Sequence, residues 1–209
     1  MSDSFAKILV VYHKKTPLYK SDVLVPIHAG RVIAKEKSKD GIISNKDLDW
    51  MISNMIGDDT GDNISKENRF LNEMTAIYWA WKNYDKLGNP EYIGLYHYRR
   101  FLGLNNIISS SNVKHVCSLY KNEKIKSILS SNDIITSSNE EDRTILEKWT
   151  NHSVPGVNIK NLNICLDYVK KDNPRIGQEM EKFLKNKSKF LCNMFIMKKE
   201  RTFAPRKSS

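Results

Sequence analysis

The stretch that decides the fold reads Tyr92-Ile93-Gly94-Leu95-Tyr96-His97-Tyr98-Arg99-Arg100. Its first five residues are aliphatic, aromatic or glycine, which is typical of a strand buried on both faces of a parallel sheet. Gly88-Asn89-Pro90, directly before it, ends any preceding helix. The polar residues from His97 to Arg100 therefore follow the carboxyl end of a buried strand.

A second run of this kind lies near the N-terminus. It reads Ile8-Leu9-Val10-Val11-Tyr12, is rich in β-branched residues, and leads into His13-Lys14-Lys15 and then Pro17. Two further apolar segments, 133–136 and 190–197, also predict strands.

The chain between residues 16 and 50 has no clear hydrophobic period, so we expect it to be irregular. It contains an apolar island at 23–30 and a charged segment at 35–46 that we expect to form a surface loop. Asp47 and Asp49 form an Asp-x-Asp pair, but no buried strand precedes them. We therefore expect this pair to lie in a surface loop as well.

The clearest helix follows a turn-rich segment, Gly57-Asp58-Asp59-Thr60-Gly61-Asp62-Asn63, with Ser65 as its N-cap. Apolar residues then recur at three- and four-residue spacing and predict one buried stripe. The stripe consists of Phe70, Leu71, Met74, Ile77, Tyr78 and Trp81. Further helices are expected at 113–120, 162–169 and 176–184, the last after Pro174.

Strands that alternate with helices predict an α/β fold with a mostly parallel central sheet flanked by helices. The chain has 209 residues, of which 40% are hydrophobic, and this suits one globular domain. We expect that domain to span residues 1–200. Cys117, Cys165 and Cys192 have no metal-binding spacing, so we expect reduced thiols in a cytoplasmic protein. Neither a signal peptide nor a membrane-spanning run is visible.

The net charge favours partners that carry phosphate. Lysine and arginine number 34, aspartate and glutamate number 24, and the formal charge is +10. A positive charge of this size attracts nucleic acid, an anionic membrane surface and nucleotide phosphates alike. Most of the lysines are scattered along the chain, which is typical of a solvated surface. No nucleic-acid motif is present and no single helix gathers the basic residues, so we expect no nucleic-acid partner.

Ligands of open α/β sheets bind beyond the carboxyl ends of the strands. The candidates at these ends are Tyr12, His13 and Lys14 after the first strand, and His97, Tyr98, Arg99 and Arg100 after the later one. Guanidinium groups bind phosphate oxygens in pairs of charge-assisted hydrogen bonds. Ion pairs or nucleic-acid contacts are the alternative use of the two arginines. Adjacent side chains of an extended backbone point to opposite faces, so only one arginine would reach a ligand there.

An ordered set of sequence blocks resembles a known family. The blocks are residues 10–14, 26–30, 58–65 with Asn68, 72–83, 92–101 and 193–197. Together they resemble, over residues 8–199, a bacterial family of domains of unknown function that includes capsular polysaccharide, exopolysaccharide and lipopolysaccharide glycosyltransferases.

The resemblance implies a GT-A-like nucleotide-binding domain. It implies a UDP-sugar donor carrying a hexose such as galactose, and a lipid-linked surface polysaccharide as acceptor. The enzyme would be cytoplasmic and peripheral at the inner face of the cytoplasmic membrane. It also adds four donor-binding candidates to those at the strand ends: Asp59, Asp62, Asn63 and Asn68. The acidic members of the 57–63 segment serve equally well as turn and capping residues.

Many GT-A enzymes hold Mn²⁺ or Mg²⁺ with an Asp-x-Asp pair after a buried strand. In this chain the corresponding strand leads into His97-Tyr98-Arg99-Arg100 instead. Fixed cations at this position could neutralise a leaving diphosphate. The sequence therefore requires no cofactor and leaves Mn²⁺ or Mg²⁺ open.

Candidates for the chemical step are Glu73 and Asp133, and Asn193 is a candidate for the acceptor. Glu73 suits a general base for an acceptor hydroxyl, with an ion pair to Lys82 or to a neighbouring residue as the alternative. Asp133 serves either as a cap or in the reaction, and His13 and Asn193 have structural alternatives too. Trp79 and Trp81 either stack on a sugar or belong to the core.

The C-terminal segment differs from the resembling family, which continues beyond residue 197 into an aromatic helix. Residues 201–209 are polar and we expect them to form a disordered tail of a truncated domain. A catalytically inactive relative that binds nucleotide or glycan is therefore the alternative to an active transferase.

Overall fold

The computed structural model describes residues 5–38, 41–102, 107–109, 112–139, 142–151, 158–187 and 189–203. The chain divides into two compact units. The first comprises Met1–Thr136 with Asn193–Ser209, and the second comprises Ser137–Cys192. The prediction of one domain over residues 1–200 stays a prediction.

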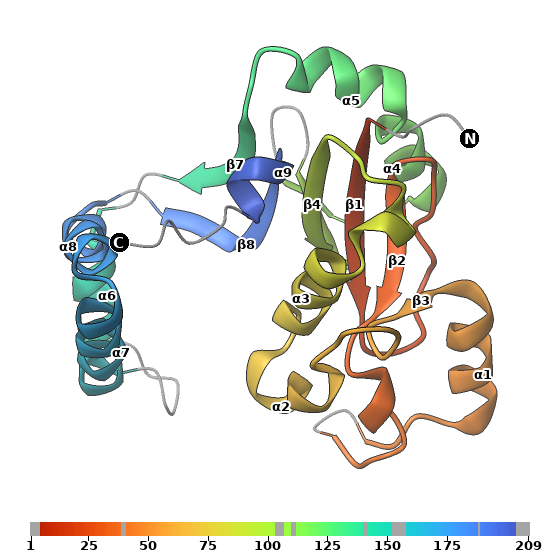
Figure 1. Ribbon diagram of the computed structural model, residues 1–209, viewed down its shortest axis with the longest axis horizontal. Coiled ribbons are helices and arrows are strands. Elements are labelled where there is room, and N and C mark those ends of the chain that lie inside the picture. The colour runs from red at the N-terminus through yellow and green to blue at the C-terminus, as the bar shows by residue number, and fades with distance from the viewer. Residues whose placement is uncertain are drawn as a thin grey trace. The chain divides into compact units, whose positions relative to one another are not determined.

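The first unit is built on a sheet whose centre is parallel, as predicted. Its strands are β1 (Ala6–Tyr12), β2 (Leu24–His28), β3 (Ile56–Gly57), β4 (Tyr92–His97), β5 (Arg100–Leu102) and β6 (Ile107–Ser109), in the spatial order β3-β2-β1-β4-β5-β6. The pairs β1–β2, β1–β4 and β2–β3 are parallel. β2, β1 and β4 lie side by side with their arrowheads at the same end, where α2 (Asn68–Leu71) also lies (Figure 1).

Two strands contain residues of both units, because the chain passes from one unit to the other within them. They are β7 (Ile134–Asn139) and β8 (Lys189–Lys198). β8 pairs antiparallel with β4, from Tyr92 opposite Lys198 to Leu95 opposite Phe195. β4 therefore pairs with β8 along most of one edge and with β5 only at its carboxyl end, where His97 lies opposite Arg100.

Helices connect and cover the strands. Besides α2, the first unit contains the 3-10 helices η1 (Arg31–Ile33), η2 (Ser65–Glu67) and η3 (Tyr84–Leu87) and the α-helices α1 (Asn45–Asn54), α3 (Met74–Lys82), α4 (Val113–Leu119), α5 (Asn122–Leu129) and α9 (Lys199–Thr202). The second unit contains α6 (Ile145–Thr150), α7 (Ile159–Asp172) and α8 (Pro174–Leu184), and Leu162, Leu166 and Leu184 form its core. None of the described helices is long and apolar enough to cross a bilayer.

Each face of the parallel sheet is covered. On one face Leu9, Ile27 and Leu95 belong to a cluster that includes Trp79 and Ala80 of α3. On the other face the rings of Tyr96 and Tyr120 meet edge to face at 5.4 Å, and the Tyr92 hydroxyl donates to the Leu129 carbonyl at 3.0 Å. Burying each large apolar side chain stabilises the fold by roughly 1.5–3 kcal/mol.

The predicted long helix is broken, and its buried face differs from the prediction. The break lies at Asn72 and Glu73, where Asn72 has φ 50°. The buried residues of α3 are Thr75, Ala76, Trp79 and Ala80, whereas Phe70, Leu71, Met74 and Trp81 are exposed. The small Ala76 and Ala80 let the helix approach the sheet closely, which the stripe of larger side chains would not.

The segment predicted as irregular contains β2 and α1. Ser44 caps α1 by accepting a hydrogen bond from the Asp47 backbone N–H at 3.1 Å, and Leu48 and Met51 are buried. Asp47 and Asp49 thus lie on a helix, and the prediction of a loop is wrong. At the other end of the chain, Arg201 and Thr202 belong to α9 and the Phe203 ring contacts that of Tyr84, whereas 204–209 lie outside the described residues.

A buried carboxylate joins the loops at the carboxyl ends of β2 and β3. Asp58 is completely buried and accepts four hydrogen bonds. The backbone N–H groups of Gly30 and Arg31 donate at 2.8 and 3.1 Å, and the hydroxyls of Ser65 and Thr75 donate at 2.6 Å each. A buried charge is tolerated only when it is satisfied in this way.

Asp58→Asn tests this junction. The new amide N–H would face groups that already donate, so we expect the free energy of unfolding to fall by about 2–3 kcal/mol. Urea denaturation measures the change, and the exposed Asp85 supplies the matched control Asp85→Asn. Equal stability of the two variants would contradict the assigned role.

Candidate functional site

The first unit contains a cavity of about 680 Å³ at the carboxyl ends of its parallel strands. Residues that follow β1, β2 and β4 line it, together with residues of η1, α2 and the segments beside them. Of the predicted site residues, it brings together His13, Asn68, Glu73, His97, Tyr98, Arg99 and Arg100.

A two-residue turn carries the arginines into the cavity. β4 ends at His97, the chain reverses at Tyr98 and Arg99, and β5 begins at Arg100. Both arginines line the cavity because Arg99 lies in the turn itself and Arg100 directly after it. The expectation that only one would reach a ligand assumed an extended backbone.

The turn stands on a buried aromatic platform. Tyr98 is buried, its ring stacks on Tyr12 at 5.5 Å, and His13 meets it edge to face at 5.5 Å. Arg99 lies over the Tyr98 ring with its guanidinium carbon 5.2 Å from the centroid. The backbone N–H of Tyr98 also donates to the Val11 carbonyl at 3.3 Å. These contacts fix the backbone of the turn, from which the side chains of Arg99 and Arg100 extend.

The cavity has an excess of positive charge. Its described lining includes four cationic side chains, Lys37, Arg69, Arg99 and Arg100, against the carboxylates Glu36 and Glu73. Glu36 is engaged by Arg69, whose Nη2 lies 2.5 Å from Oε2. Sequence reasoning missed Lys37 and Arg69, because scattered basic residues give no sign of converging on one space.

Glu73 belongs to a network with two polar side chains. Asn193 Nδ2 donates to Glu73 Oε1 at 2.8 Å, and His97 Nε2 lies 2.9 Å from Asn193 Oδ1. His97 Nε2 is also 3.6 Å from Glu73 Oε1. Lys82 Nζ lies 3.7 Å from Asp62 and does not pair with Glu73, so of the ion pairs expected as the alternative for Glu73, the one with a neighbouring residue is represented by His97.

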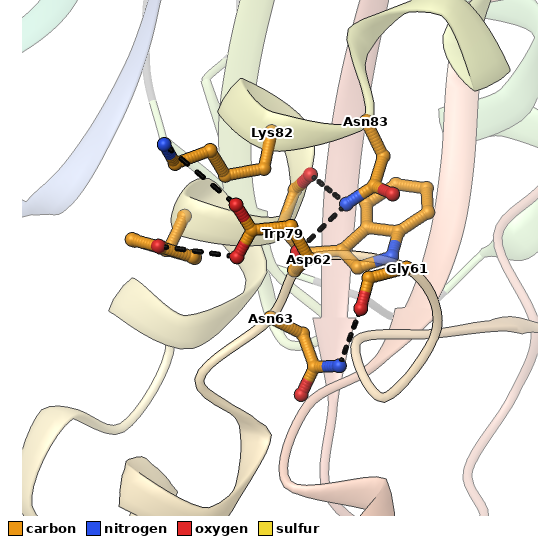
Figure 2. Close-up of polar contacts among 7 residues, drawn as sticks. Gly61, Asp62, Asn63, Trp79, Lys82 and Asn83 are labelled. Carbon is orange, nitrogen blue, oxygen red and sulfur yellow. Dashed lines mark hydrogen bonds and ion pairs between the residues drawn. The ribbon is translucent and has the colours of Figure 1, made fainter.

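The acidic turn segment forms its own contacts outside the lining of the cavity (Figure 2). Asp62 accepts from the Tyr78 hydroxyl at 3.3 Å. Asn63 donates to the Gly61 carbonyl at 2.9 Å and accepts from the Ser65 backbone N–H at 3.2 Å. These contacts agree with the turn and capping alternative.

Five other predicted residues also lie away from the cavity lining. They are Tyr12, Lys14, Asp59, Asp133 and Asn193, the last of which contacts Glu73 of the lining. The Tyr12 hydroxyl donates to the Pro17 carbonyl and accepts from the Tyr19 N–H, and one oxygen of Asp59 is buried beside Gly57.

Asp133 lies at the end of the strands opposite to the cavity. It pairs with Lys198 at 2.7 Å and with Arg201 at 3.5 Å. Because Lys198 lies opposite Tyr92, this pair is at the amino end of β4. The hydrogen bond from Lys198 lowers the pKa of Asp133. The structure thus separates Asp133 from Glu73 and the arginines.

The described residues do not form a divalent metal site. No group of three His, Cys, Asp or Glu side chains among them is arranged to hold a metal ion. The Asp47 and Asp49 pair lies on α1, and Asp47 pairs with Lys15 at 2.9 Å.

Two residues at the carboxyl end of β2, His28 in the strand and Gly30 after it, shape the cavity without having been predicted. Gly30 has φ 70°, and an added Cβ would come within 2.6 Å of Asn68 Oδ1, so the position requires glycine. His28 lines the cavity yet is only 1% exposed. Burial, followed by the charge of Arg31, lowers the pKa of His28 to about 4, although Asp58 opposes the shift and His13 adds to it.

Comparisons with known proteins concern nearly the whole chain. A family model described as "Domain of unknown function (DUF4422)" matches residues 7–204. The apo structure of a bifunctional glycosyltransferase, WbbM, is similar with a TM-score of 0.71 and 23% identity, and the match covers 95% of this chain. It covers 34% of that chain, so this chain spans about a third of that protein, and the likeness concerns the fold. No curated protein matches the chain.

The buried His28 makes stability depend on pH. An unfolded histidine has a pKa near 6.5, so unfolding takes up a proton between pH 6.5 and the folded value of about 4. Stability is retained above this window and falls as the pH drops through it, by about 2 kcal/mol between pH 7 and 5.

Urea denaturation at both pH values measures this loss. We expect His28→Gln to remove it, and His115→Gln, at an exposed position of α4, to retain it. The same pH dependence in both variants would show that His28 is not its source.

Proposed function

The chain belongs to the DUF4422 family, and we propose that it is a glycosyltransferase that takes a hexose from a nucleotide-sugar. The observation that carries the proposal is a cavity at the strand ends that combines an excess of cations with a positioned carboxylate. The similarity to the fold of a bifunctional glycosyltransferase supports it.

The donor would bind with its diphosphate at the β4–β5 turn. Arg99 and Arg100 line the cavity there, and Lys37 adds further positive charge, whereas the charge of Arg69 is paired with Glu36. Each hydrogen bond to a charged group contributes about 1.5–3 kcal/mol. A UDP-hexose, with galactose as the first sugar to test, is the proposed donor.

The reaction exchanges one bond at the anomeric carbon for another. The acceptor hydroxyl oxygen forms a bond to that carbon, while the bond to the diphosphate breaks and its electron pair leaves with the nucleotide. The arginines stabilise the charge that develops on the leaving diphosphate. Glu73 receives the proton of the acceptor hydroxyl.

The proposed acceptor is a lipid-linked surface glycan. Its lipid would hold it at the inner face of the cytoplasmic membrane, where anionic headgroups attract basic residues by about 1 kcal/mol each. The net charge of +10 favours this location.

The double variant Arg99→Ala/Arg100→Ala tests the donor site. We expect the Kd for UDP to rise at least about 100-fold, because two charge-assisted contacts are lost. Isothermal titration measures this, and UDP should no longer raise the melting temperature. Arg143→Ala, at an exposed arginine outside the cavity lining, is the matched control. Unchanged UDP affinity in the double variant would exclude this site.

Glu73→Gln tests the chemical step. The amide cannot accept the proton, so we expect kcat for sugar transfer to fall by about 10²–10⁴-fold while UDP affinity is retained. Single-turnover transfer from UDP-galactose to a lipid-linked glycan measures the rate. A wild-type chain that binds UDP without transfer or donor hydrolysis, over a panel of sugars, would favour the inactive binding relative instead.

A further inference from the structure

Asn193 has an unusual backbone conformation at the point where β8 leaves β4. The ladder of paired residues between the two strands ends at Leu95 opposite Phe195. Two residues before Phe195, Asn193 has φ 36°, in the left-handed region that non-glycine residues rarely occupy. Departures of this kind next to a site re-aim a side chain that would otherwise follow the alternation of the strand.

A second left-handed residue lies on the other side of the same contact. Asn72 has φ 50° and directly precedes Glu73. Its carbonyl accepts from Asn68 Nδ2 at 2.7 Å and from the Thr75 backbone N–H at 3.3 Å, and these hydrogen bonds hold the bend in place. Strained positions that the surroundings maintain are concentrated at functional sites. Two of them converge here on the hydrogen bond between Asn193 and Glu73.

The hydrogen bonds of this network have a defined direction. An ionised carboxylate only accepts hydrogen bonds, so the amide nitrogen of Asn193 must be the group that faces Glu73 Oε1, at 2.8 Å. The amide oxygen then faces His97 Nε2 at 2.9 Å and accepts from it. His97 therefore carries a proton on Nε2.

Asn193 bridges a gap that the other two side chains do not close. His97 Nε2 and Glu73 Oε1 are 3.6 Å apart, too far for a good hydrogen bond. Among the described residues, no group donates to Glu73 Oε2. The network therefore occupies Oε1 and leaves Oε2 to accept a proton.

We infer that Asn193 is a positioning residue, whose amide holds the carboxylate of Glu73 and the Nε2–H tautomer of His97 as one unit at the cavity wall. This inference rests on the proposed function, in which Glu73 accepts the proton of the acceptor hydroxyl. It gives Asn193 a role through Glu73, in place of the acceptor contact expected from the sequence.

Two substitutions of Asn193 distinguish its contact with Glu73 from its contact with His97. Both aspartate and glycine tolerate the left-handed backbone, so neither Asn193→Asp nor Asn193→Gly adds strain there. Aspartate keeps an oxygen that accepts from His97 but sets a second carboxylate against Glu73. Glycine removes both contacts. Asn89→Gly is the matched control, because Asn89 also has a positive φ, of 50°, and lies outside the cavity lining.

The first readout is nitrogen NMR of the His97 ring at about pH 8.5, where an ordinary imidazole is neutral. We expect the proton on Nε2 in the wild-type chain and in Asn193→Asp, and a mixture of tautomers in Asn193→Gly. This readout needs neither donor nor acceptor. A wild-type His97 with its proton on Nδ1 would overturn the inference, whatever the chain transfers.

The second readout is single-turnover sugar transfer. We expect about a 100-fold loss in both Asn193 variants, with UDP affinity retained, and no loss in Asn89→Gly. Wild-type rates in either Asn193 variant would overturn the inference. A wild-type chain that transfers no sugar contradicts the proposed function, and the NMR result then decides the role of Asn193 by itself.

Discussion

The geometry of the cavity depends on the buried carboxylate of Asp58. Its four donors come from the turn after β2, from η2 and from α3, so one side chain joins three segments that the sheet alone would leave apart. Gly30, which donates to Asp58, lines the cavity, and Thr75 lies two residues after Glu73. The need to satisfy a buried charge therefore also sets the positions of residues at the site.

The site combines two kinds of group that different physics holds in place. Arg99 and Arg100 stand on a short turn supported by stacked aromatic rings, and each carries its charge at the end of a flexible side chain. Glu73 is held by hydrogen bonds of fixed direction. Several cationic side chains suit the negative charge of a diphosphate, which is spread over many oxygens. Proton transfer, in contrast, requires that a single acceptor oxygen is held in a fixed position. The proposed transferase needs both, which explains why the cavity has two differently built sides.

The sequence predicts the parts of this structure that depend on local pattern. β1 and β4 are continuous apolar runs, so their burial and the location of a site at their ends follow from the sequence. The face of α3 does not, because two alanines and Thr75 pack inward while larger apolar residues stay exposed. The turn at Tyr98 and Arg99 depends on pairing with β5, which no local pattern reveals. Glu73 and Asn193 are 120 residues apart, and only the completed sheet brings them together.

The edge of β4 that β5 and β8 share has a consequence for how such a chain changes over evolutionary time. β5 meets β4 only at His97, while β8 lies along the rest of that edge and supplies Asn193. A one-residue slip of β8 would reverse the facing of its side chains and remove Asn193, yet leave the β4–β5 hairpin intact. Under the proposed function, turnover can thus be lost in a lineage while affinity for the nucleotide persists. A single shift in strand register would thus convert a transferase into a protein that only binds nucleotide.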